Sequence, residues 1–176
     1  MTPATSARSA TAPDVAAAIA TELRSAISEA LTSLENVSPQ QSEHRPRPGA
    51  WSPREIIGHL IDSASNNHGR FVRGALHDSL VFPGYDQEAW VTLHGYQTQD
   101  WTQLLQRWST FNEQIAAAVE RISADALGRP RREHNFHQIA WRTVPAGEET
   151  TLEYFIRDYI AHLRHHLAQI SRAVGD

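Results

Sequence analysis

Four long stretches of this chain repeat apolar residues at the spacing of an α-helix. They span about residues 14–36, 52–76, 100–122 and 150–174. Apolar side chains three and four positions apart line one face of a helix, and that face must be buried against another element. Helices of ~23–25 residues are each ~35 Å long, which suits side-by-side packing. The sequence therefore predicts an all-α protein, a four-helix bundle with long inter-helix loops.

Two of the predicted helices begin with a capping signal. Ser52 is followed by Pro53 and then, three residues after the serine, by Glu55. A serine cap, a proline at the first helical position and a glutamate at the third form a capping box that stabilises a helix start. Thr150, with Glu153 three residues later, repeats the spacing and predicts the start of the fourth helix.

The connections between these helices are long. Prolines at positions 39, 46 and 48 are expected to keep residues 37–50 free of helix. The connection 78–99 is unusually long for a compact domain, which indicates that the bundle is not a simple up-and-down series. The connection 128–149 is polar and irregular and is compatible with a short hairpin. Residues 1–12 are rich in Ala, Ser and Thr and predict a flexible tail, followed by one domain over 13–176.

Composition excludes several kinds of chemistry. The chain has no cysteine and no lysine, and all sixteen of its basic residues are arginine. Disulfides, thiolate metal ligands, cysteine nucleophiles and lysine Schiff bases are therefore excluded, and any thiol chemistry needs an exogenous thiol. A net charge of −4 without a basic block argues against nucleic-acid binding. We find no secretory signal and no apolar run of ~20 residues, so we expect a cytoplasmic protein without membrane contact.

A histidine-rich run near the end of the chain points to a metal site. His162 and His166 are four residues apart, so a helix presents both on one face. The neighbours of His166 at helical spacing are more apolar than those of His165, which favours His166 as the inward-facing partner of His162. A third ligand would come from His59 on the second predicted helix. Three histidines with an open position can activate water or a thiol.

His59 lies on a polar stripe of its helix, which suits either the edge of an internal cavity or an ordinary solvent face. Its members at helical spacing are Glu55, Asp62, Ser63, Asn66 and Arg70. A metal-ligating histidine usually donates its other N–H to a carboxylate or carbonyl. The carboxylates placed to accept it are those of Glu55, Asp62 and Asp158.

Asp62 and Asp158 are also the candidate catalytic bases. Other histidines remain alternatives as ligands, and an HxxxH pair also arises by chance on a purely structural helix. These alternatives are His68, His77, His94, His134 and His137. Three arginines in the last connection, Arg129, Arg131 and Arg132, are either solvated or bind the carboxylates of an anionic substrate or cofactor.

Three segments resemble the DinB/YfiT-like superfamily. Trp51–Ser63 resembles the first metal-ligand helix of that family, 158–170 is similar to its terminal signature, and 82–90 is similar to the linker of one branch. The resemblance covers roughly residues 45–172. It implies a four-helix bundle with a metal near one end. The ligands would be His59, His162 and His166, and nickel, zinc and iron all suit imidazole.

The resemblance implies a metal-dependent hydrolase whose three-histidine centre activates water. Two alternatives stay open: a thiol-dependent S-transferase or isomerase that uses a low-molecular-weight thiol at the metal, and a non-catalytic stress-response module that binds metal or a ligand. A small-molecule substrate is expected, and homodimers are common in the family. Because imidazole must be neutral to bind a metal, metal affinity is expected to fall as the pH drops through roughly 6.

Overall fold

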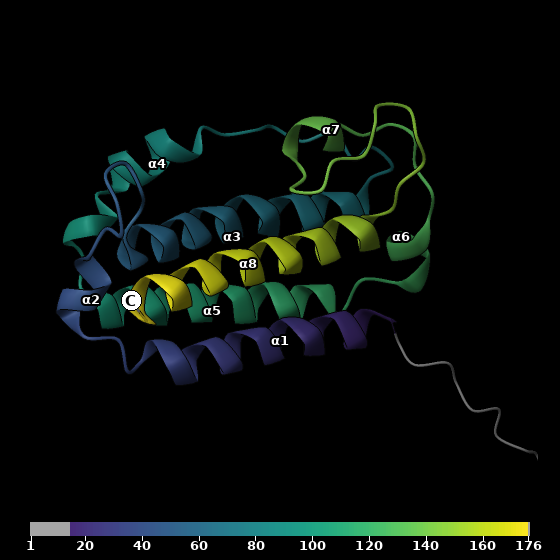
Figure 1. Cartoon of the computed structure of the whole chain (residues 1–176). Coiled ribbons are helices and arrows are strands. Elements are labelled where there is room, and N and C mark those ends of the chain that lie inside the picture. Colours follow the sequence, from purple (N-terminus) through teal and green to yellow (C-terminus); the bar gives the residue numbers. More distant parts are fainter. Residues whose placement is uncertain (1–14, 176) are drawn as a thin grey trace, which may run out of the picture.

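Four long helices form the body of the protein. The structure is a computed structural model that describes residues 15–175, so the predicted tail 1–12 lies outside the described residues. The helices run side by side along the molecule (Figure 1). They are α1 (Val15–Leu34), α3 (Pro53–Leu76), α5 (Trp101–Val119) and α8 (Leu152–Gly175). The predicted all-α four-helix bundle is therefore confirmed.

The order of the helices around the bundle differs from that of a simple up-and-down series. α1 packs mainly on α5 and α8, and α3 also packs on α5 and α8, so α1 and α3 lie diagonally opposite. α3 and α5 run in the same direction, and α1 and α8 run in the opposite one (Figure 1). The connection between α3 and α5 must therefore return along the whole bundle, which accounts for its length.

The apolar stripes of the four helices meet in one core. Ile57 and Leu60 of α3 are 0% and 1% exposed, and they belong to the same core as Trp108 of α5 and Leu163 of α8, which are both fully buried. Burying an aliphatic or aromatic side chain of this size contributes about 1.5–3 kcal/mol. The core thereby holds α3 and α8 against each other, which fixes the relative positions of their polar residues.

The two predicted capping boxes have different outcomes. The Ser52 hydroxyl accepts a hydrogen bond from the backbone N–H of Glu55 at 3.3 Å, and the Glu55 carboxylate accepts one from Ser52 N–H at 2.9 Å, so this box is confirmed. The prediction at Thr150 was wrong by one residue. The Thr151 hydroxyl accepts from the N–H of Tyr154 at 3.0 Å, and Thr150 pairs its backbone with Arg131 instead.

The connections contain short helical elements that periodicity did not predict, because each is too short to repeat an apolar pattern. They are α2 (Pro39–Glu43), α4 (Gln87–His94), η1 (Tyr96–Thr98), α6 (Ala124–Gly128) and α7 (Phe136–Ile139). The connection around α7 forms no hairpin strands and contains only the isolated bridges 80↔134 and 131↔150 within residues 15–175. No helix in this part of the chain is long and apolar enough to cross a bilayer.

The prolines of residues 37–50 do not exclude helix, contrary to expectation. Pro39 is the first residue of α2, where its missing N–H costs nothing because that group would have no partner in the helix. Ser38 and Gln41 form a capping box around it. A proline therefore marks a helix start here rather than a helix break.

Gly58 allows the connection between α3 and α5 to approach α3 closely. A Cβ atom at this position would lie 2.0 Å from Cδ2 of Tyr96, far inside van der Waals contact. The Tyr96 ring lies over the glycine, and its hydroxyl donates a hydrogen bond to Asp62 at 2.7 Å. The glycine thus positions η1 against the helix that carries His59.

We therefore expect Gly58→Ala to destabilise the protein by about 2 kcal/mol or more, because Tyr96 must move and its bond to Asp62 is lost. Urea unfolding measures the change. Gly69→Ala on the same helix is the matched control, since a Cβ there would meet only the flexible end of Arg73, at 3.1 Å. That control should be neutral or stabilising by up to ~1 kcal/mol. Equal stability of the two variants would contradict the prediction.

Candidate metal centre

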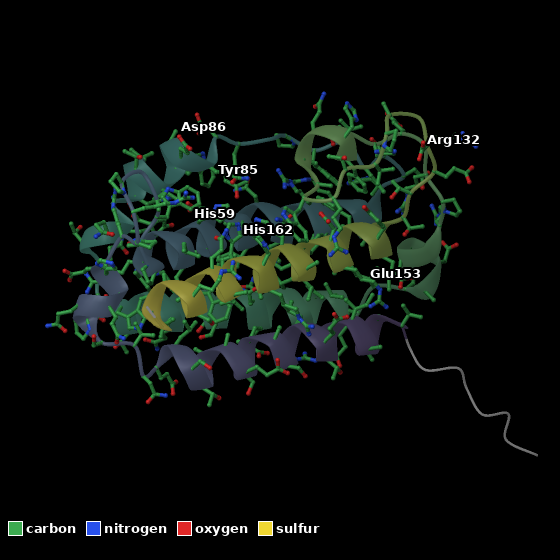
Figure 2. All side chains as sticks on the ribbon, viewed as in Figure 1. His59, Tyr85, Asp86, Arg132, Glu153 and His162 are labelled. Carbon is green, nitrogen blue, oxygen red and sulfur yellow. The ribbon has the colours of Figure 1, made fainter. Side chains whose placement is uncertain are left out.

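Three histidines converge between α3 and α8. His59 projects from the second turn of α3 (Pro53–Leu76) toward α8, where it meets His162 (Figure 2). The Nε2 atoms of His59 and His162 are 3.3 Å apart, and those of His162 and His166 are 3.0 Å apart. One ring nitrogen from each of the three lies within 4.8 Å of the others. The structure therefore brings together the three predicted metal ligands.

The spacing of these nitrogens fits a divalent transition metal. With metal–nitrogen bonds of ~2.0–2.1 Å, tetrahedral geometry places adjacent ligand nitrogens ~3.3–3.4 Å apart. The separations of the His162 Nε2 atom from those of His59 and His166, 3.3 and 3.0 Å, are close to that value. Nitrogen donors of this kind suit zinc, nickel and iron alike. Three protein ligands leave a coordination position free, as in catalytic rather than structural sites.

Burial keeps these imidazoles neutral, which is the form that binds a metal. His59 is fully buried, and desolvation, helped by the nearby His166, lowers its pKa to about 3. Desolvation also lowers the pKa of His162 to about 3, with smaller contributions from the neighbouring histidines. Burial lowers the pKa of His166 in the same direction. Proton competition for the metal therefore sets in at a lower pH than the value near 6 expected from the sequence.

The second ring nitrogens of His59 and His166 do not bond to the predicted carboxylates. Nδ1 of His166 lies 2.8 Å from Oε1 of Gln169, one turn further along α8. Nδ1 of His59 is buried and has no hydrogen-bond partner within residues 15–175. Glu55 does not accept a hydrogen bond from a histidine. Its carboxylate instead accepts one from the backbone N–H of Ser52 and forms an ion pair with Arg45 at 2.5 Å.

Asp62 lies one turn after His59, but its observed partners come from the connection between α3 and α5. Its Oδ1 accepts from Tyr96 at 2.7 Å and lies 3.0 Å from Nδ1 of His94. Oδ2 is buried without a partner in the described part of the chain, and burial raises the pKa of this carboxyl group. Asp62 thus fastens η1 to α3, and it does not line the cavity described next.

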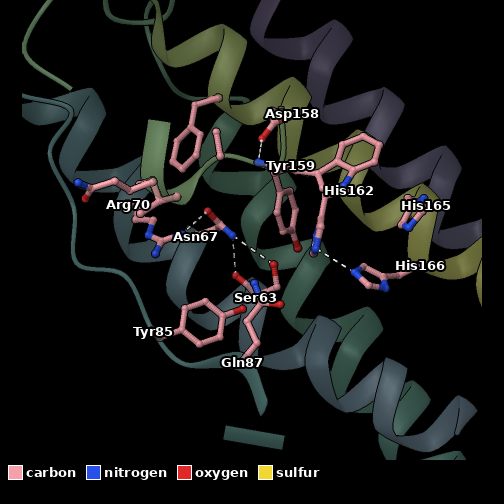
Figure 3. A pocket seen from close by; sticks show the side chains of 15 residues that line it. Ser63, Asn67, Arg70, Tyr85, Gln87, Asp158, Tyr159, His162, His165 and His166 are labelled. Carbon is pink, nitrogen blue, oxygen red and sulfur yellow. Dashed lines mark hydrogen bonds between the residues drawn. The ribbon is translucent and has the colours of Figure 1, made fainter. Parts of the chain in front are cut away.

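A polar cavity of about 370 Å³ opens beside the histidines (Figure 3). Its walls are α3 and α8. Residues 85–87 and 138–141, which we call the roof segments, cover it. The lining side chains with polar groups include Ser63, Asn67, Arg70, Tyr85, Asp158 and His162. The sequence left open whether the polar stripe of α3 borders an internal cavity or faces solvent. Because Ser63 and Arg70 of this stripe line the cavity, the structure supports the first alternative.

Asp158 lies one turn before His162 and lines this cavity. Its two oxygens accept hydrogen bonds from the backbone N–H groups of Trp141 and Arg142, at 2.8 and 2.9 Å. Burial raises the pKa of Asp158, while these two hydrogen bonds oppose the shift. The carboxylate therefore anchors one roof segment to the helix that carries two of the metal ligands.

The predicted arginine cluster is not at this cavity. Arg129 pairs with Asp78 and Asp125, and Arg132 pairs with Glu149 at 3.1 Å. Arg131 is buried, but its contacts lie at the bridge to residue 150. Arg132 lies well away from His59 and His162 (Figure 2). The guanidinium group that lines the cavity belongs to Arg70 instead.

The alternative ligand histidines and several lining residues also differ from expectation. His134 is engaged within its own loop, with Nε2 2.9 Å from the carbonyl of Glu148. Asn67, Tyr85 and Gln169 contribute to the site or its surroundings without having been predicted to do so. Arg70 could have been found, because it shares the polar stripe of His59. Tyr85 could not, since only the long-range fold brings it over α3.

The sequence profile of the DinB superfamily matches residues 22–170. The chain therefore belongs to the DinB superfamily, a conclusion that agrees with the resemblance noted in the sequence and with the bundle described above.

Curated relatives include YfiT of Bacillus subtilis, 26% identical over 132 residues that cover 73% of this chain and 68% of YfiT. A Bacillus licheniformis protein is 27% identical over 124 residues, 70% of this chain and 65% of the relative. Both relatives carry names that describe them as proposed metal-dependent hydrolases. The solved YfiT structure, described as an unusual four-helix bundle topology, superposes with a TM-score of 0.74 at 21% identity, covering 96% and 91% of the two chains.

The lowered pKa values predict acid sensitivity of the metal-free fold. The unfolded chain protonates His59 and His162 near pH 6.5, whereas the folded chain does so only near pH 3. The unfolded state therefore binds more protons between these values, and the free energy of unfolding falls as the pH falls, by roughly 1 kcal/mol per pH unit for each histidine.

Thermal unfolding of the chelator-treated protein between pH 7 and pH 4 measures this dependence. His59→Gln removes one of the two groups, so its stability should depend on pH with a visibly smaller slope. Identical slopes for the variant and the unchanged protein would contradict the assignment.

Proposed function

We propose that this protein is a metal-dependent hydrolase of small molecules, with a divalent transition metal held by His59, His162 and His166. The observation that carries the proposal is the convergence of three neutral imidazoles within 4.8 Å of one another, two of which, those of His162 and His166, line a polar cavity. A metal bound there supplies a Lewis acid that makes water nucleophilic near neutral pH. The names given to the relatives support the same class of reaction.

The side chains of the cavity provide the other requirements of hydrolysis. Asp158 is the carboxylate closest in sequence to the ligands that also lines the cavity, so we assign it the role of proton acceptor. Its bonds to Trp141 and Arg142 fix its orientation, and each oxygen retains a further lone pair for a proton. Asp62 is a positioning residue in this scheme, because it acts through Tyr96 and His94.

A second cavity favours thiol transfer as the other candidate function. It has a volume of about 550 Å³ and is lined mainly by α8 and by residues 46–51. His166 is shared by both cavities. Hydrolysis needs space for one organic substrate, whereas transfer needs space for a thiol and an electrophile. Product formation that requires an added low-molecular-weight thiol would favour transfer over hydrolysis.

Metal content tests the ligand assignment directly. We expect tag-free protein, loaded with zinc, nickel or iron and then desalted, to retain ~1 equivalent per chain. His162→Ala and His166→Ala should lower this to less than about 0.1 equivalent, because each removes a bond to the metal. His165→Ala is the matched control, since His165 is adjacent to His166 but exposed. Equal losses in His165→Ala and His166→Ala would contradict the assignment.

Hydrolysis of a panel of small esters and amides tests the reaction. Activity should disappear with a chelator and return with the metal. Asp158→Asn should lower kcat by about 100-fold or more at unchanged metal content, as expected for loss of a general base. Asp62→Asn should have a smaller effect, because this residue does not line the cavity. Full metal occupancy without turnover of any substrate would contradict the hydrolase proposal.

A further inference from the structure

Arg70 is a buried cation without an anion beside it among residues 15–175. It is 4% exposed, on the cavity side of α3. A guanidinium has five N–H donors. The described part of the chain supplies two acceptors, Oδ1 of Asn67 at 3.3 Å and the carbonyl of Pro83 at 2.7 Å. Both acceptors are uncharged. The titratable groups that act on Arg70 electrostatically are those of Tyr85 and Arg73, and no carboxylate within residues 15–175 is among them.

The other buried arginines have acids nearby. Arg54, on the same helix and 8% exposed, pairs with Glu43 at 2.9 Å. Nε and Nη1 of Arg131 have no hydrogen-bond partner within residues 15–175, but the carboxylates of Asp78 and Asp125 act on this guanidinium electrostatically. The centroid of the Tyr85 ring lies 6.0 Å from the guanidinium carbon of Arg70. Burial raises the pKa of the Tyr85 hydroxyl to about 12, so this group carries no charge near neutral pH. Among the buried arginines of residues 15–175, Arg70 is therefore the one on which no carboxylate acts, and it lines the cavity.

An uncompensated buried charge is costly, and proteins normally pair or coordinate such groups. The polar row of α3 holds Arg70 in place nonetheless. Asn67 donates a hydrogen bond to the Ser63 carbonyl at 2.9 Å and accepts one from Arg70. Three polar residues on successive turns of α3 therefore form one hydrogen-bonded row. Such preorganisation of a charge facing a cavity is expected where a ligand completes the pair.

The row separates Arg70 from the histidines. Ser63 and Asn67 lie between Arg70 and His162 along the cavity (Figure 3). His59 and Arg70 are eleven positions apart on one helix, a rise of about 16 Å between their Cα atoms. The Arg70 side chain points back toward the start of its helix, which shortens this span. A single elongated molecule can therefore contact both ends.

We infer that the cavity binds a substrate with a carboxylate at one end, held by Arg70, and its reacting group at the other end, beside His59, His162 and His166. A carboxylate matches the planar fork of a guanidinium. A single negative charge is favoured because Arg70 is the one arginine among the residues lining the cavity, which also contains Asp158. This inference rests on the proposed function, and it specifies the substrate class for the same site.

Paired probes of different length test the inference on the zinc-loaded full chain. The probes are ω-mercapto acids of four, six and eight carbons and the corresponding amides, with 6-mercaptohexyl phosphate as a dianionic comparison. Both members of a pair present a thiol to the metal, and only the acid presents a carboxylate to Arg70. Isothermal titration calorimetry measures each affinity.

We expect at least one acid to bind ten times more tightly than its amide. Arg70→Gln should reduce that ratio to less than two, with zinc content unchanged. Arg73→Gln, which removes an exposed arginine from the same helix, should preserve it. Ratios below two for every pair in the unchanged protein would overturn the inference, as would tighter binding of the phosphate than of the six-carbon acid. Because the unchanged protein carries this test, poor folding of Arg70→Gln would not obscure it.

The design separates this inference from the proposed function. Binding of the amides reports on the metal centre alone and should be lost in His162→Ala. If the amides do not bind, the metal assignment fails, and hexanoate and hexanamide are then compared on the chelator-treated chain. Preference for hexanoate that depends on Arg70 would support the carboxylate site even then, and absence of the preference would overturn it.

Discussion

The candidate metal centre and its cavity depend on one constraint, which is that the polar side chains of α3 are buried as well as its apolar ones. One side of this helix packs into the bundle core, as in any four-helix bundle. The other side carries His59, Asp62, Ser63, Asn67 and Arg70, and all of these are buried as well. Polar groups removed from water must find partners or bind a ligand. The contacts of Tyr96, His94 and Pro83 with this side meet part of that requirement.

The topology of the bundle provides the cover for that polar side. Since α3 and α5 run in the same direction, the chain between them returns over α3 (Figure 1). This return places Tyr85 above the cavity and the Tyr96 ring against Gly58. Asp158 then fastens the second roof segment through the N–H groups of Trp141 and Arg142. The cavity therefore results from chain connectivity as much as from the four helices.

Local rules predicted the four long helices and the pairing of His162 with His166, because both depend on spacing along one helix. His59 lies on another helix, and its choice depended on its polar stripe and on the family resemblance. His162 and His166 share a face of α8, and the choice of His166 over the exposed His165 followed from its neighbours. Long-range pairings were not accessible in this way. The partners of Asp62 come from more than thirty residues away, and the short helices carry too few residues for a periodic signal. The one-residue error at Thr150 shows that a capping motif locates a helix start only approximately.

Because the metal ligands and the roof segments lie on different parts of the chain, substrate preference can change between related proteins without a change in the ligand-bearing helices. The metal ligands lie on α3 and α8, whose positions are fixed by the shared core. The roof segments, by contrast, belong to the connections between the long helices; the second is held by the Trp141–Asp158 hydrogen bond and by the packing of Ile139 and Ala140 on the core. Substitutions or insertions there can reshape the cavity while the ligand-bearing helices keep their packing. One invariant framework can in this way serve a series of proteins that differ in what they admit.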